Sequence, residues 1–402
     1  MGLGYLANLS WLSVFLLLGV LASIVAVKFK LPKILFLILI GVILGMTNWI
    51  AFDESFLISF GLFALVMIIF ESTSKFKLGE VNNLYPVALK LTVIFLVINL
   101  IFFTTFIHLF FGKVLTLSAI LISLLFATMM SGTDAGVVLS VFKDNSVKVA
   151  KILEFESIIN TPITVIFPLI ILYWFEGTLH AGDIILFFTR GVMAGIGTGL
   201  VIGLVSFRLM KKEYLKSISP LLLVALALIS YTLAEQIGGN GVLSVTTLGL
   251  VFGWSVVRSK QHIQEFVNLF TNFLTIVVFI LLGLLIKLPS NYIFLLKSIA
   301  LFAIYIALRF IAIHFTFIRH DEISFKEKIF MSLNAGKGVA VAVIAFIIIA
   351  KLASPGMLNS ADVANLRLVL ELSFLFILYS IILSTAVLRF SNYFIGRNPH
   401  PE

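Results

Sequence analysis

The sequence predicts an all-α protein that crosses a membrane about thirteen times. Of its 402 residues, 61% are hydrophobic and only 12% are charged, which lies far outside the balance of a soluble globular domain. The mean hydropathy is +1.17. Apolar runs of membrane-span length continue almost to the last residues, so we expect neither a cleavable leader nor a sizeable soluble domain.

The predicted spans are apolar runs that can cross a hydrocarbon core of about 30 Å, which takes about 20 helical residues. Shorter runs are included because membrane helices can be broken where they line a cavity. Pro32 leads the second run, and polar, glycine-containing stretches interrupt the fifth and the twelfth. In chain order, the runs lie near residues 9–27, 32–47, 55–71, 84–111, 115–140, 149–174, 183–207, 218–236, 241–257, 265–286, 292–317, 328–351 and 366–390.

The basic residues predict how the chain is oriented. The formal net charge of +9 could indicate nucleic-acid binding, but lysines and arginines cluster in alternate loops, as they do in the cytoplasmic loops of membrane proteins. We therefore expect a cell-membrane protein with an outer N-terminus, a cytoplasmic C-terminus and no nucleic-acid partner. The predicted cytoplasmic loops contain Lys28, Lys30, Lys33, Lys75, Lys77, Lys143, Lys148, Lys151, Arg208, Lys211, Lys212, Lys216, Arg258, Lys260, Arg319, Lys326 and Lys328, whereas the opposite loops contain little more than Lys113 and Lys287.

The two halves of the chain resemble each other in hydropathy, with an offset of roughly 195 to 210 residues. The run from Leu31 matches the run from Gly241, and the run with SGTDAG matches the run with NAGKGVAV. The offset crosses an odd number of spans, so the second copy is inverted, as in many secondary transporters. We predict a first repeat over residues 1–182, a linker helix and loop over 183–217, and a second repeat over 218–402.

Two spans are predicted to be broken helices that cross near the middle of the membrane. Ser131–Gly136 (SGTDAG) interrupts the first of them, and Asn334–Gly338 (NAGKG) interrupts its counterpart. Asp134 could offset the partial positive charge of helix N-terminal ends, and Lys337 the partial negative charge of C-terminal ends. The alternative is that these glycines only allow close helix packing, but packing does not explain a charge in each break.

A second polar stretch, Glu154–Thr161 (EFESIINT), lies inside the sixth span. Glu156 and Asn160 are four residues apart and share a helix face, with Ser157 beside them and Thr161 one residue further round. A charged side chain at membrane depth costs several kcal/mol and therefore marks an ion or proton pathway. Thr133 and Asp134 of the broken span should reach the same region.

The chain resembles the cation/proton antiporter superfamily, in particular its archaeal and bacterial sodium/proton exchangers. The resemblance covers nearly the whole chain and rests on LPKILFLILIGVILG near the start, FES at Phe70–Ser72, GTD at Gly132–Asp134, FESIIN at Phe155–Asn160, GGNGVLSV at Gly238–Val245, FILLGLLIKL at Phe279–Leu288, LRF at Leu308–Phe310 and GKGVAVAV at Gly336–Val343. It implies crossed inverted repeats in which a core domain moves against a dimerisation domain, usually in a homodimer.

One departure from the family is important for the mechanism. In the family, the Glu-Ser pair is followed by Asn-Asp or Asp-Asp, and the last Asp carries the ion or the proton, whereas this chain has Asn160 and then Thr161. A threonine hydroxyl can offer an oxygen to a cation but cannot exchange a proton near neutral pH. We therefore expect Asp134 to bind either a sodium ion or a proton, with neutral oxygens from Thr133, Ser157, Asn160 and Thr161.

Three further charged residues have two possible roles each. The resemblance pairs Glu156 with Arg309, which would fix helix packing instead of carrying substrate. Glu71 is either a solvated loop carboxylate beside Lys75 or, as the resemblance implies, an acid in a cytoplasmic funnel that attracts cations. Lys337 either neutralises the crossed helix ends or exchanges a proton itself.

The leading hypothesis is a secondary transporter that exchanges a monovalent cation, most readily sodium, for protons. Thr161 also motivates two alternatives, which are transport of potassium or another substrate without proton coupling, and a sensor or scaffold that no longer transports. The sequence shows no phosphate-binding glycine loop, metal-ligand cluster or nucleophile motif, so we expect neither an enzyme nor a cofactor.

Overall fold

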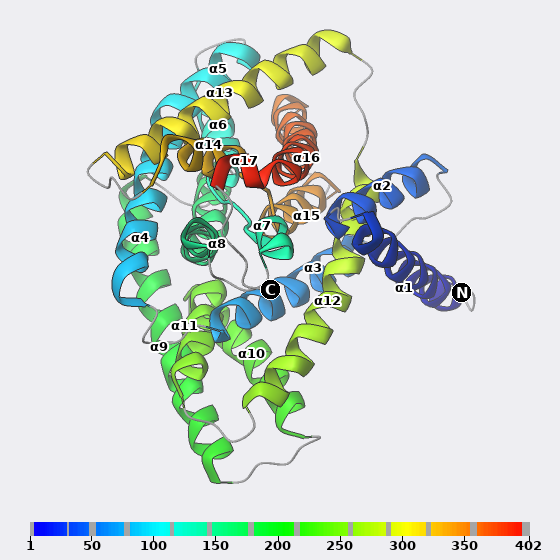
Figure 1. The fold of residues 1–402 in the computed structure, drawn as a ribbon, viewed down its shortest axis with the longest axis vertical. Coiled ribbons are helices and arrows are strands. Elements are labelled where there is room, and N and C mark those ends of the chain that lie inside the picture. Colours follow the sequence, from blue (N-terminus) through cyan, green and yellow to red (C-terminus); the bar gives the residue numbers. More distant parts are fainter. Residues whose placement is uncertain are drawn as a thin grey trace.

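The computed structural model describes residues 4–29, 32–47, 54–75, 81–112, 116–142, 147–175, 181–212, 218–255, 260–286, 291–318, 323–353 and 360–395. These residues form helices and contain no strand (Figure 1). The helices are α1 (Gly4–Phe29), α2 (Lys33–Met46), α3 (Glu54–Ser74), α4 (Val81–Ile98), η2 (Asn99–Phe103), α5 (Thr104–Phe111), α6 (Leu117–Met129), α7 (Gly136–Val141), α8 (Lys148–Phe175), η3 (Ala181–Asp183), α9 (Ile184–Lys212), α10 (Ser219–Gln236), α11 (Gly241–Trp254), α12 (Lys260–Leu285), α13 (Tyr292–Thr316), α14 (Phe325–Leu333), α15 (Val339–Ala353), α16 (Ser360–Arg389) and α17 (Ser391–Ile395).

The predicted fold class is confirmed, because each predicted span falls on a helix or on a consecutive set of helices. Among the described residues, eight helices are long and apolar enough to cross a membrane, and five shorter apolar segments accompany them. The fourth predicted run is the continuous series α4–η2–α5, in which η2 is a π-helical turn. The total number of crossings stays a prediction.

Some residues behind the predicted orientation and domain boundaries lie outside the described residues. Residues 213–217 of the predicted linker are among them. The basic residues concerned are Lys30, Lys77, Lys113, Lys143, Lys216, Arg258, Lys287 and Arg319. The orientation of the chain and the division at residues 182 and 217 therefore stay predictions.

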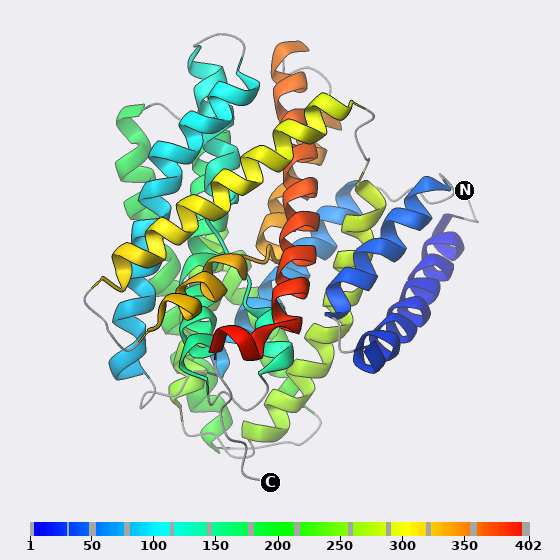
Figure 2. The same ribbon diagram turned by 45° about the horizontal axis from the view of Figure 1, so that its top comes forward.

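The helices gather into two regions that meet around α3, α8 and α15. One region contains α4 to α8 and α13 to α17, and α13 runs across α4 and α16 within it (Figures 1 and 2). The other contains α1 to α3 and α9 to α12, with α9, α10 and α11 at one end and α1 and α2 at one side (Figure 1). The helix α3 contacts α15 and α8 of the first region as well as α11 and α12 of its own.

The packing is compatible with the predicted inverted repeats, which stay a prediction. If α2 corresponds to α11 and α3 to α12, a two-fold relation requires that a contact between α2 and α12 be matched by one between α11 and α3. Both contacts are present and extensive. The contacts of α7 with α16 and of α15 with α8, the corresponding helices of the two copies, form a second matched pair.

Glycines allow the helices of the second region to approach each other to backbone contact. A Cβ atom at Gly41 of α2 would lie 2.2 Å from the carbonyl oxygen of Ile280 in α12, and one at Gly283 would lie 2.4 Å from that of Ile38. On α9, a Cβ at Gly199 would lie 2.2 Å from the carbonyl oxygen of Ser244 in α11. Membrane helices associate through such small-residue contacts because burying apolar side chains gives little advantage within lipid.

The seam between α2 and α12 yields a stability prediction. Gly41→Ala places a methyl group against backbone that cannot rotate away, so it should cost about 1–3 kcal/mol and lower the midpoint of thermal unfolding in detergent. Gly197→Ala is the matched control because no atom lies within 4 Å of a Cβ added there, and alanine favours a helix over glycine. If Gly41→Ala were as stable as Gly197→Ala, the close contact of α2 with α12 would be wrong.

Candidate functional site

The two predicted breaks meet inside the protein. The first separates α6 from α7 at residues 130–135, and the second separates α14 from α15 at residues 334–338. The backbone N–H of Asp134 donates a hydrogen bond to the carbonyl oxygen of Gly336 at 2.7 Å, which joins the two breaks directly. Irregular backbone is tolerated at membrane depth only where protein or a cavity surrounds it, and both breaks meet this condition.

Lys337 holds the end of α6 from the opposite break. Its ammonium group donates hydrogen bonds to the carbonyl oxygens of Met130 and Gly132, both at 2.7 Å, and to the hydroxyl oxygen of Tyr305 at 2.5 Å. The ammonium nitrogen also lies 4.4 Å from the centre of the Tyr305 ring. The last carbonyls of a helix lack partners within that helix and carry partial negative charge, so the buried cation satisfies the C-terminal end of α6.

Asp134 lies at the other side of the crossing, beside two helix N-terminal ends. Its Oδ1 accepts a hydrogen bond from the backbone N–H of Gly136, the first residue of α7, at 2.7 Å. A Cβ atom at Gly338, just before α15, would lie 2.1 Å from Oδ2, so only glycine leaves room for this carboxylate. Asp134 is half-buried, and no described lysine, arginine or histidine forms an ion pair with it.

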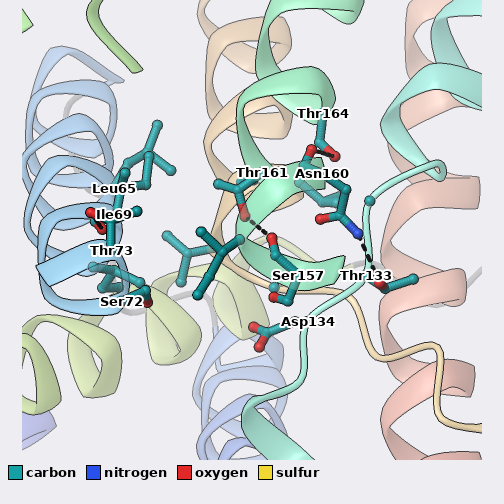
Figure 3. Close-up of a pocket in the computed structure, with 17 residues that line it drawn as sticks. Leu65, Ile69, Ser72, Thr73, Thr133, Asp134, Ser157, Asn160, Thr161 and Thr164 are labelled. Atoms are coloured by element: carbon teal, nitrogen blue, oxygen red, sulfur yellow. Dashed lines mark hydrogen bonds between the residues drawn. The ribbon is translucent and has the colours of Figure 1, made fainter. Parts of the chain in front are cut away.

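The polar face of α8 contributes neutral oxygens to the same region. The amide nitrogen of Asn160 donates to the Thr133 hydroxyl oxygen at 2.8 Å, which ties α8 to the first break. The Thr161 hydroxyl donates to the backbone carbonyl of Ser157, one turn earlier, at 2.6 Å. Figure 3 shows the labelled side chains of Asp134, Ser157 and Thr133 lying next to one another.

These residues line a cavity of about 80 Å³ between α3, α8 and the two breaks (Figure 3). One buried water needs a volume of about 10–15 Å³. The cavity therefore has room for a cation with several waters. Its wall is formed by Leu65, Ile68, Ile69, Ser72, Thr73, Gly132, Thr133, Asp134, Ser157, Ile158, Asn160, Thr161, Thr164, Gly338, Val339, Ala340 and Val341.

Glu156 faces away from this cavity and pairs with Arg309 of α13. The two guanidinium nitrogens Nη1 and Nη2 donate to the two carboxylate oxygens at 2.9 and 3.0 Å, and both residues are 0% exposed. The guanidinium carbon lies 5.1 Å from the centre of the Phe95 ring, which closes the pair on one side. Glu156 is therefore absent from the residues that line the cavity, although the sequence analysis grouped it with them.

Glu71 lies near the cavity but is not part of its wall. Its carboxylate forms an ion pair with Lys75 one turn later in the chain, and its side chain is 20% exposed. The next two residues, Ser72 and Thr73, do line the cavity. The geometry leaves both predicted roles of Glu71 open.

Several residues around the site were missed by the sequence analysis. Ser72 and Thr73 were overlooked because the segment was interpreted through the charge of its neighbour Glu71. Thr164 was overlooked because it follows Pro162 in an apolar stretch. Tyr305 lies one turn before Arg309 on the same face of α13, so its i, i+4 spacing from a charged intramembrane residue was a usable signal.

The buried pair of Glu156 and Arg309 yields a second stability prediction. Glu156→Leu leaves the Arg309 guanidinium charged, buried and unpaired, which should cost about 3–5 kcal/mol. Adding Arg309→Met removes that charge, so the double variant should recover most of the loss in thermal or chemical unfolding experiments. A single variant that unfolded like the unaltered protein would contradict the pairing.

Comparison with known proteins places this arrangement in a family. Residues 13–390 match the family model described as "Sodium/hydrogen exchanger, transmembrane". The chain is 26% identical over 298 residues to the probable Na(+)/H(+) antiporter 2 of Methanocaldococcus jannaschii, with 70% of each chain covered. It is also 27% identical over 230 residues to the K(+)/H(+) antiporter NhaP2 of Shewanella sp. (strain MR-4), with 55% of this chain and 40% of that protein covered.

A solved structure shares the complete fold. The structure of the sodium proton antiporter MjNhaP1 from Methanocaldococcus jannaschii at pH 8 superposes with a TM-score of 0.86, at 20% identity, over 98% of this chain and 100% of that one. The family model spans nearly the whole chain, and the solved structure has the same helical fold. The chain therefore belongs to the transmembrane sodium/hydrogen exchanger family.

Proposed function

We propose that the protein exchanges sodium ions for protons across a membrane, and that Asp134 carries both. The observation that supports this most directly is the composition of the cavity wall, in which Asp134 is the single carboxylate among the residues named above. The wall otherwise contains hydroxyls, an amide and apolar side chains. Family membership and the names of the relatives support sodium and protons as the two substrates.

The proposed coupling is competition for one carboxylate. A charged carboxylate is costly in the low-dielectric interior of a membrane protein, so it is stabilised when either a proton or a cation neutralises it. Asp134 can hold one of the two at a time, and each loaded form is neutral at that position. Loading with sodium on one side and with a proton on the other gives exchange without a second titrating group.

Neutral oxygens then complete the sodium site. Hard cations bind clustered oxygen ligands, and Thr133, Ser157, Asn160 and Thr161 bring hydroxyl and amide groups to the cavity that contains Asp134. The hydrogen bond from Asn160 to Thr133 holds these two side chains in place before the ion arrives. Because none of these groups titrates near neutral pH, they favour the cation and leave the proton to Asp134.

The remaining buried charges, the Glu156–Arg309 ion pair and Lys337, have structural roles in this proposal. Glu156 has both carboxylate oxygens occupied by Arg309, and Lys337 has three acceptors within 2.7 Å. Removing a proton from Lys337 or separating the ion pair would leave buried groups without partners. Both therefore serve the crossing of the helices, and neither takes part in the exchange.

The cavity lies between the two regions of the fold, which suggests how access alternates. Its walls come from α3 of one region and from α8 and the broken helices of the other. Rigid-body movement of the second set against the first would expose Asp134 to one side at a time, as in other transporters with inverted repeats. In this proposal the repeats span residues 1–182 and 218–402, and the linker spans 183–217. The region with α1 to α3 and α9 to α12 forms the contact of a homodimer.

The proposed setting is the cell membrane, with the N-terminus outside and the C-terminus in the cytoplasm. This orientation places the end of α3, with Glu71 and Lys75, at the cytoplasmic side. Potassium is the second candidate cation, because a relative is named a K(+)/H(+) antiporter.

Asp134→Asn should abolish cation-dependent proton movement, because an amide neither ionises nor takes up a proton in this pH range. The measurement uses proteoliposomes with an imposed pH gradient, to which sodium, lithium or potassium is added in turn. The gradient should collapse on addition of sodium with the unaltered protein and persist with the variant.

The matched control is Glu265→Gln, which changes an exposed carboxylate of α12 that is absent from the cavity wall. It should transport like the unaltered protein. Full activity of Asp134→Asn would remove Asp134 as the carrier, and collapse by potassium alone would replace sodium as the substrate.

A further inference from the structure

We propose that the backbone carbonyl oxygen of Ile158 is a ligand of the transported cation, and that Pro162 makes this oxygen available. The inference rests on the proposed function, because it adds one oxygen to the same site. It assigns a role to one of the two prolines inside α8, Pro162 and Pro168.

The first step concerns the hydrogen bonds of α8. Pro162 lies inside this helix and is buried. Proline has no N–H group, so the carbonyl four residues earlier loses its normal helical donor. That carbonyl belongs to Ile158. An unpaired backbone carbonyl at membrane depth is costly unless another group satisfies it.

The second step concerns the position of this carbonyl. Ile158 lines the cavity and is half-buried. Ser157 precedes it, and Thr161 follows it at the i+3 spacing that places two residues on one helix face, and both of these also line the cavity. The unpaired carbonyl therefore belongs to the turn of α8 whose residues line the same cavity as Asp134.

The third step concerns Thr161, the position at which the resemblance would place an aspartate. Its hydroxyl hydrogen is donated to the Ser157 carbonyl at 2.6 Å. The hydroxyl oxygen retains its lone pairs and lies on the same turn as the Ile158 carbonyl. This turn of α8 thus carries a carbonyl oxygen and a hydroxyl oxygen that can both act as acceptors, without a second negative charge.

These oxygens explain how a site with one carboxylate can replace the water molecules that sodium loses when it leaves the solvent. A backbone carbonyl carries a strong dipole and is a normal ligand for hard cations in proteins and in the unwound helices of transporters. It does not bind a proton in the physiological range. The Ile158 oxygen therefore strengthens binding of the cation and leaves binding of the proton to Asp134, which preserves the competition.

Pro162→Ala tests this role because alanine restores the N–H group and with it the hydrogen bond to the Ile158 carbonyl. Alanine is also the better helix former, so the variant should be at least as stable. We expect the apparent KM for sodium in proteoliposomes, and the Kd of purified protein for radioactive sodium, to rise about tenfold. The maximal rate should stay within about twofold, since Asp134 is unchanged.

Pro86→Ala is the matched control, because Pro86 also lies inside a helix, α4, but is absent from the cavity wall. Its KM and Kd for sodium should equal those of the unaltered protein. Pro162→Gly restores the same N–H group with a different replacing residue, so the test does not depend on the folding of a single variant.

The outcomes separate this inference from the proposed function. If the unaltered protein moves protons in response to sodium but the folded Pro162 variants keep its KM and Kd, the Ile158 carbonyl is not a ligand. If the Pro86 variant weakens sodium binding as much as Pro162→Ala, the effect comes from helix geometry in general, and the inference is also overturned. If the unaltered protein shows no response to any cation, the proposed function itself fails.

Discussion

The rest of the site depends on the hydrogen bonds from Lys337 to the end of α6. A buried ammonium group donates to two carbonyl oxygens of the opposite break and to Tyr305, while the Asp134 N–H donates back to Gly336. These contacts fix two interrupted helices against each other, so that their free N-terminal ends converge on one carboxylate. Without them, the breaks would expose unpaired backbone at membrane depth, where each unpaired group costs several kcal/mol.

This arrangement separates the charges that hold the fold from the charge that we assign to exchange. Glu156 and Arg309 neutralise each other away from the cavity, and Lys337 is enclosed by oxygen atoms of the protein. Asp134 is the one member of the four that lines the cavity. In our proposal, one carboxylate among neutral oxygens exchanges one cation for one proton. Thr161 then supplies an oxygen at the position where the sequence resemblance would place a second acid.

The sequence predicted those features that local chemistry determines. Glycines next to Asp134 and Lys337 indicated the two breaks. The broken span was expected to bring Thr133 to the polar residues of α8, and Asn160 does contact Thr133. The position of Glu156 was less well predicted, because spacing alone cannot tell which side of a buried helix faces a cavity, and the pairing with Arg309 came from the resemblance. The contact of Tyr305 with Lys337 and the place of Ser72 and Thr73 in the cavity wall depend on how α13 and α3 pack against the breaks, which neighbouring residues in the sequence do not determine.

The most direct measurement of the central claim is the number of protons released when sodium binds to the purified protein. Calorimetric titration in buffers of different ionisation enthalpy gives this number at a pH where Asp134 is protonated. Our account predicts close to one proton per sodium ion, and none with Asp134→Asn. Sodium binding without proton release, or undiminished release from the variant, would contradict the assignment of exchange to a single carboxylate.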